Sequence, residues 1–243
     1  MKDPKMYKYH VANMHSIEIA IDQTALSARQ SIADENNKAI RSFVSLYAFL
    51  IGAWAENRLK KLLYEKDAFS PTERKTILVQ NTQLDQWNKI LEVSYRKHYK
   101  LPKAQITGMT IPLTAFARYQ ILLDTLNTDL QDVIEIRNKL AHGQWIYPFT
   151  NDGLKVETNK YNTLQNANLL ALQFQWSLIK NLSNVIHDLV VSLQTFDRDF
   201  DKNFKLITNT RINLKKRSYQ QYASQLIAKR RNGILKRKTA VQP

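Results

Sequence analysis

Hydrophobic residues recur along this chain mostly three and four places apart, which is the spacing of one face of a helix. The longest such segment runs from Ser31 or Asp34 to about Lys66 and predicts one long amphipathic helix. Further helices are expected from Pro71, where a proline follows a capping serine, and over residues 84–99. The pattern therefore indicates helices over most of residues 31–99.

The same spacing continues in the rest of the chain. It predicts a helix from about residue 112 to Ala141, followed by Gly143 in the place of a C-terminal capping glycine, and another over about 164–196. Between them, residues 144–157 hold two short apolar runs around an Asp-Gly step, which predicts a small β-hairpin. We therefore expect an all-α fold, a helical bundle of about five helices with a small β-hairpin after the helix that ends at Ala141.

Basic residues are concentrated at the C-terminal end. Residues 202–243 hold twelve of the 36 Lys and Arg residues and no Asp or Glu, which leaves 24 basic against 21 acidic residues in the rest of the chain. We divide the chain into a helical domain over residues 1–201, with its core at about 35–197, and a basic C-terminal extension over 202–243. Such an extension can bind a polyanion through counterion release. The candidate RNA-binding residues are Lys215, Lys216, Arg217, Lys229, Arg230 and Arg231.

Other interpretations of the basic extension remain open. The same composition is typical of a solvated, partly disordered tail. It also suits docking on an acidic protein or on an anionic membrane surface. Charge alone does not choose among these partners.

Composition limits the kind of protein this can be. The chain has no cysteine, which excludes disulfide scaffolds, thiolate metal sites and cysteine nucleophiles. Its longest uncharged apolar run, residues 43–55, is shorter than the about 20 residues that cross a bilayer. The first ten residues lack the apolar stretch of a secretory signal. We expect a cytoplasmic protein with no metal site, no cofactor and no membrane partner.

The candidate chemistry lies at the end of the helix that precedes Gly143. Asn138 and His142 are four residues apart and share a helix face, and the long side chain of Arg137 can swing toward that face. Cleavage of RNA without a metal needs a base for the ribose 2′-hydroxyl proton and positive charge at the phosphate. Histidine suits the proton transfer and arginine suits a two-pronged phosphate contact. Arg137, Asn138 and His142 are therefore the candidate catalytic residues.

A purely structural role accounts for the same residues. Arg137 and Asn138 can cap carbonyl groups at the helix end and pair with Asp132 or Glu135. His142 can hydrogen-bond at the helix terminus, where a cation is favourable. Physics alone favours this interpretation over the catalytic one.

The run Arg137-Asn138-Lys139-Leu140-Ala141-His142-Gly143 resembles the arginine, polar residue and histidine motif of the HEPN superfamily. It stands, as in that family, near the end of a core helix and before a last long helix, and Trp54-Ala55-Glu56-Asn57-Arg58-Leu59 is similar to the opening helix of many members. The resemblance covers roughly residues 35–197, and only the motif is specific.

The resemblance implies a function and roles for the motif residues. HEPN ribonucleases are metal-independent, leave 2′,3′-cyclic phosphate and 5′-hydroxyl ends, and commonly act as dimers with two motifs in one cleft. Arg137 would stabilise the scissile phosphate, Asn138 would orient the site and His142 would transfer the proton. In members paired with a nucleotidyltransferase antitoxin, a tyrosine stands two places after the histidine; here that place is Gln144, although Tyr147 is nearby.

We therefore expect an endoribonuclease, a toxin or antiviral-defence effector that works as a homodimer on RNA. An acidic antitoxin or regulatory protein is a further expected partner, because the extension is basic. The alternative is a catalytically silent HEPN-like module that binds RNA or a protein. A helical scaffold with a coincidental motif is the third hypothesis.

Overall fold

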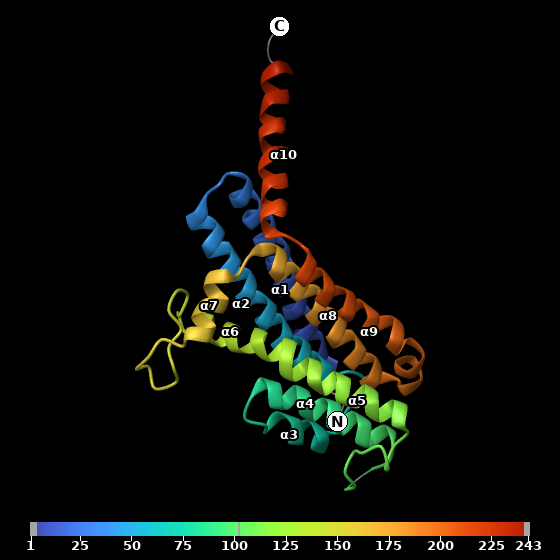
Figure 1. The fold of residues 1–243 in the computed structure, drawn as a ribbon. Helices are drawn as coiled ribbons and strands as arrows, with labels where there is room; N and C mark the ends of the chain where they lie inside the picture. Colours follow the sequence, from blue (N-terminus) through green and yellow to red (C-terminus); the bar gives the residue numbers. More distant parts are fainter. Residues whose placement is uncertain (1–3, 102, 241–243) are drawn as a thin grey trace.

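The computed structural model describes residues 4–101 and 103–240, and within them the chain forms helices and no β-strand. This confirms the all-α class. Figure 1 shows a bundle from which one helix projects. The elements are α1 (Pro4–Ala33), α2 (Asn37–Leu63), α3 (Pro71–Leu78), α4 (Gln83–His98), α5 (Leu113–Thr125), the π-helical segment η1 (Leu126–Leu130), α6 (Gln131–Ala141), α7 (Thr158–Asn166), α8 (Leu169–Val191), α9 (Leu193–Lys216) and α10 (Tyr219–Ala240).

The bundle has more helices than the about five expected, and α1 is the main addition. It lies along α2 (Figure 1) and buries Ile21 and Ile32 in the core. Its other buried positions include the small residues Ala25 and Ala28, while Leu26 is exposed. Because its larger apolar residues are not gathered on one face, its amphipathic pattern in the sequence is weak. The turn after α1 lets α2 begin at Asn37, later than expected.

The expected helix over about 112–141 exists as α5, η1 and α6 in continuous succession. At η1 the amide of Gln131 donates to the carbonyl of Leu126, which places one extra residue in the turn. Beyond it, α6 packs on α2 at Gly52. A Cβ at that position would lie 2.3 Å from the Cβ of Arg137 and 3.2 Å from the carbonyl oxygen of Val133. Glycine therefore allows α2 and α6 to approach closely enough to position Arg137.

The expected helix over about 164–196 is divided at Ser192. This residue has an extended backbone, and its hydroxyl accepts from the amide of Thr195 at 3.2 Å, so it ends α8 and caps α9. The proposed division between residues 201 and 202 falls inside α9, whose Ile207 is fully buried. The beginning of the basic extension is thus a helix of the bundle. None of the helices described is long and apolar enough to span a membrane.

The predicted β-hairpin over 144–157 is wrong in the part of the chain described. The two runs meet only at an isolated antiparallel bridge between Phe149 and Val156, and the Asp-Gly turn at Gly153 (φ 72°) forms as expected. Pro148 has no amide hydrogen to extend the pairing. Several apolar side chains of the segment are exposed, so no second layer stabilises a two-stranded ladder. Residues 144–157 form an exposed loop (Figure 1).

Candidate active site at the end of α6

The end of α6 forms as the sequence predicts. The amide of Gly143 donates to the carbonyl of Leu140 at 3.1 Å, and the amide of Gln144 donates to that of Lys139 at 3.0 Å. These two hydrogen bonds, with Gly143 at φ 76°, are a Schellman motif. His142 is the C-cap residue. The glycine thus ends the helix directly after the candidate histidine.

Arg137 is held by two oxygen acceptors. One guanidinium nitrogen donates to the side-chain oxygen of Asn138 at 3.0 Å, and another forms an ion pair with Glu56 of α2. The Nε atom is buried, with no partner among the described residues. The Arg137 side chain is 26% exposed. Its guanidinium is therefore fixed in direction and remains partly open to solvent.

Glu56 is a residue of the site that sequence reasoning missed. Partial burial opposes its ionisation, but a hydrogen bond from Lys60 at 2.6 Å and the charge of Arg137 outweigh it and lower the pKa of Glu56. Glu56 therefore stays ionised at neutral pH. It lies 81 positions from Arg137, and nothing local in Trp54-Ala55-Glu56 indicates the pairing.

The structural interpretation of the motif allowed Arg137 to pair with Asp132 or Glu135, and this pairing is not formed. Both carboxylates form ion pairs with Lys160 of α7, and Glu135 also accepts from Gln131 at 2.7 Å. Lys160 therefore pairs with the two carboxylates that lie near Arg137 in the sequence.

His142 has an exposed side chain with no hydrogen bond or ion pair to any described residue. The helix-terminus hydrogen bond of the structural interpretation is thus not formed by its ring. His187, by contrast, contacts Glu65 at 3.3 Å, and His10 stacks on Tyr64. His142 is accordingly available to a ligand, while these two histidines are engaged in the fold. No hydrogen bond joins His142 to Arg137 within the chain described.

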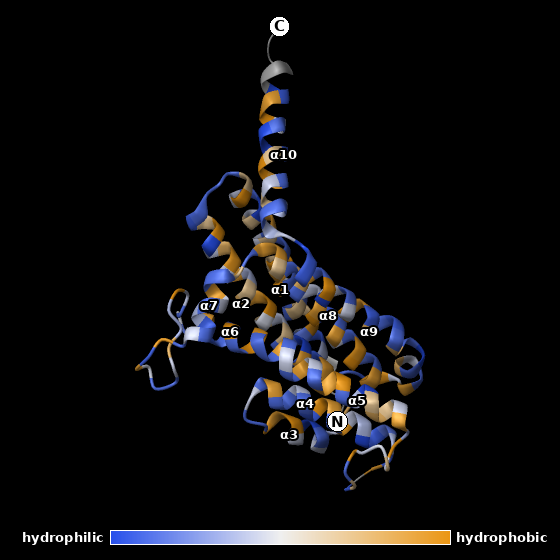
Figure 2. Cartoon of the chain, viewed as in Figure 1, coloured by the Kyte–Doolittle hydropathy of each residue, from blue (hydrophilic) through white to orange (hydrophobic). Residues whose placement is uncertain are grey.

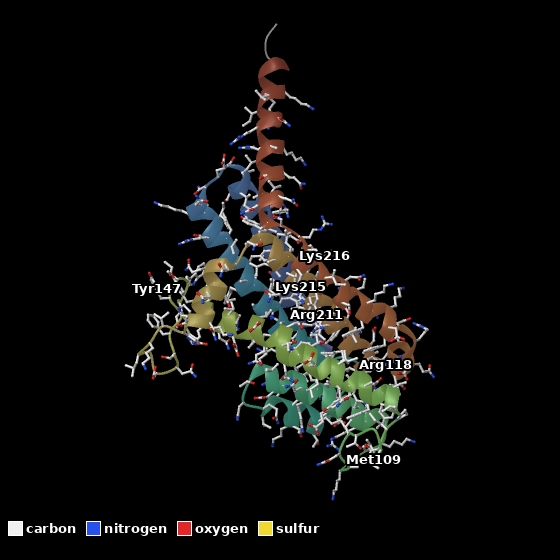
Figure 3. The ribbon with its side chains drawn as sticks, viewed as in Figure 1. Met109, Arg118, Tyr147, Arg211, Lys215 and Lys216 are labelled. Carbon is white, nitrogen blue, oxygen red and sulfur yellow. The ribbon has the colours of Figure 1, made fainter. Side chains whose placement is uncertain are left out.

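Two other residues named in the sequence analysis lie in the loop after the motif. The side-chain oxygen of Gln144 accepts from the amide of Phe149 at 2.8 Å, so this residue organises the loop. Tyr147 is 54% exposed and stacks on Tyr161. Figure 3 shows Tyr147 at the left of the view, far from Lys215 and Lys216 near the base of α10.

The six candidate RNA-binding residues do not form one cluster. Lys215 and Lys216 end α9, Arg217 follows them, and the other three lie on α10. Arg230 forms an ion pair with Asp34 at 3.1 Å and Arg231 with Glu35 at 2.9 Å, so both hold the middle of α10 on the turn between α1 and α2. Figure 2 shows hydrophilic and hydrophobic residues alternating around the projecting part of α10.

In the part of the chain described, no three His, Asp or Glu side chains lie together in a way that could hold a metal ion. Comparison with protein-family models, with curated proteins and with solved structures found no match to this chain.

Proposed function

We propose that this chain is a metal-independent endoribonuclease of the HEPN type, acting in the cytoplasm as a toxin or antiviral-defence effector. One observation carries the proposal: α6 presents an arginine oriented by two acceptors, and the same helix ends on a histidine whose ring is exposed and unengaged. An oriented cation and a free proton acceptor are the two groups that this cleavage needs.

Each of the three side chains has one role in the proposed reaction. The ring of His142 takes the proton of the ribose 2′-hydroxyl as that oxygen attacks the phosphorus, and the bond from phosphorus to the 5′-oxygen breaks. Arg137 stabilises the charge that develops on the phosphate oxygens. Asn138 keeps the guanidinium directed. The departing 5′-oxygen takes up a proton from water, so the products are a 2′,3′-cyclic phosphate and a 5′-hydroxyl.

The proposal includes a two-fold dimer in which Arg137 and His142 of both copies line one cleft. A single chain supplies only one of each residue, and Glu56 offsets the charge of its Arg137. A second copy doubles the cations and histidines that face one phosphate. Sedimentation should show a dimer at micromolar concentration. A fully active monomer would contradict this part.

The test is cleavage of a defined single-stranded RNA in excess EDTA, with analysis of the product ends. His142→Ala should lower the rate by about 100-fold or more, because general acid–base catalysis contributes about 10²–10⁴-fold. RNA binding and folding should barely change. His15→Ala, which removes another exposed histidine, is the matched control and should leave the rate unchanged. Cleavage that needs a divalent ion, or that survives His142→Ala, would contradict the proposed chemistry.

A catalytically silent module that binds RNA or a protein is the second candidate. The pairing of Arg137 with Glu56 favours it, since a neutralised arginine also serves as a link between α2 and α6. The same assay separates the two candidates. RNA retention without cleavage, unaffected by His142→Ala, would support the silent module.

A further inference from the structure

A groove lies beside the end of α6, between the N-terminal part of α2, the loop over 144–157 and the end of α7. Its volume is about 320 Å³, at the lower end of the range of small-molecule pockets. Its lining consists of polar, charged and apolar side chains of α2, two apolar residues that follow the motif, and three residues at and after the end of α7: Lys38, Ile40, Arg41, Ser42, Val44, Ser45, Trp145, Ile146, Leu164, Gln165 and Ala167. None of its lining residues is acidic.

Two cations stand at this groove, Lys38 and Arg41 of α2. Both side chains are exposed, and neither forms an ion pair with a described residue. By contrast, Arg230, Arg231 and Arg137 each pair with a carboxylate. The groove therefore carries two uncompensated positive charges, which suits a phosphodiester.

An aromatic wall completes the groove. The indole Nε1 of Trp145 donates to the carbonyl of Leu140 at 3.1 Å, which fixes the ring against the last turn of α6. The residue is still 40% exposed. Val44 and Leu164 supply apolar surface, and Gln165 supplies an amide that can donate and accept. A fixed indole beside an apolar surface and an amide suits a nucleobase, which needs a stacking face and polar partners for its edge.

The groove lies close to the motif on one side and to α10 on the other. Trp145 follows His142 by three residues, and its hydrogen bond keeps it at the end of the motif helix. Lys38 follows Glu35 by three residues, and Glu35 pairs with Arg231 of α10. The groove is thus bounded by the start of α2, which follows the turn paired with α10, and by Trp145 at the end of the motif helix.

We infer that this groove binds one unpaired nucleotide of a single-stranded RNA next to the bond that is cut. Trp145 stacks on the base, and Lys38 and Arg41 contact its flanking phosphates. The position beside the cut bond rests on the proposed function, whereas binding of the nucleotide can be tested separately.

The experiment measures binding of a fluorescent, fully 2′-O-methylated single-stranded RNA, which cannot be cleaved, by anisotropy over a range of salt. Trp145→Ala should weaken binding between about fivefold and 150-fold, the range typical of base–aromatic stacking, and Trp145→Phe should restore most of it. Arg41→Ala and Lys38→Ala should each lower the logarithmic salt slope by about 0.7. Lys75→Ala, which removes an exposed charge on α3, is the control and should change neither quantity by a comparable amount.

Circular dichroism establishes whether each variant is folded, and Arg41→Glu, at an exposed position, carries the test if Trp145→Ala does not fold. Binding that is unchanged in Arg41→Glu and in a folded tryptophan variant would overturn the inference, as would a wild-type protein that does not bind this RNA. If cleavage of natural RNA depends on His142 while these variants bind RNA normally, the inference about the groove is wrong and the proposed function is supported. If no RNA is cleaved but RNA binding depends on Trp145 and Arg41, the inference about the groove is supported and the proposed ribonuclease function is wrong.

Discussion

Arg137 has two acceptors that differ in charge, and this decides how its variants should behave. Arg137→Ala should lower cleavage by about 100-fold or more, because it removes charge stabilisation at the phosphate. Arg137→Lys should rescue only part of the rate, since an ammonium cannot make the planar two-pronged contact. Asn138→Ala should be milder, because Glu56 still holds the guanidinium. Single-turnover rates at saturating RNA measure all three. Equal rates for Arg137→Ala and wild type would remove this residue from the site.

The lowered pKa of Glu56 leads to a prediction about how the stability of the protein depends on pH. Its pKa in the folded protein is lowered, so its ion pair contributes stability at neutral pH that is lost as pH falls below the ordinary glutamate value of about 4.3 and through the lower folded value. Glu56→Gln should therefore destabilise the protein at pH 7 and less so near pH 3. Urea unfolding at both pH values measures the difference. A difference that does not shrink on acidification would show that the carboxylate charge of Glu56, through Lys60 and Arg137, does not stabilise the fold.

At the scale of helices, Gly52 sets the approach of α2 to α6. Gly52→Ala places a Cβ 2.3 Å from the Cβ of Arg137, so one helix or the arginine must move. The expected cost is about 1–3 kcal/mol of unfolding free energy, as for other overpacked cores, with a loss of cleavage. Gly233→Ala is the matched control: a Cβ there meets nothing within 4 Å, and alanine favours a helix. Gly233→Ala should be neutral or slightly stabilising. Similar losses in both variants would contradict the packing argument.

At the scale of the whole molecule, the projecting helix α10 should raise affinity for RNA without taking part in the chemistry. Changing Lys229, Lys236 and Arg237 to Gln should flatten the salt dependence of RNA binding by about 0.7 for each phosphate that the helix no longer neutralises, while cleavage at saturating RNA survives. These exposed residues avoid the two ion pairs that anchor the helix. An unchanged salt slope would indicate that α10 binds a protein partner and not RNA.

The fold restricts how that experiment is extended to a deletion. Removing residues 202–243 would cut α9 and take Ile207 out of the core. A deletion from Tyr219 onward removes α10 and leaves α9 whole. It removes six basic residues, so it should flatten the salt slope at least as much as the three Gln substitutions.

Short-range patterns in the sequence were sufficient for the helical class, for the helix that carries Arg137, Asn138 and His142, and for its end at Gly143. Helical periodicity and glycine capping depend on neighbours a few residues away, so they can be read from the chain directly. The hairpin prediction failed for a related reason, because a turn signal alone does not supply the layer that a ladder packs against.

Tertiary packing alone decided what surrounds the motif. Packing placed Arg137 in an ion pair with the distant Glu56. It placed Asp132 and Glu135 in ion pairs with Lys160. It also brought the start of α2, Trp145 and the end of α7 to one groove. An ion pair or a groove depends on which helix faces lie together, and that depends on the burial of the whole core. The sequence by itself thus determined which side chains stand at the end of α6, and the packing of the helices determined which charges and surfaces they meet.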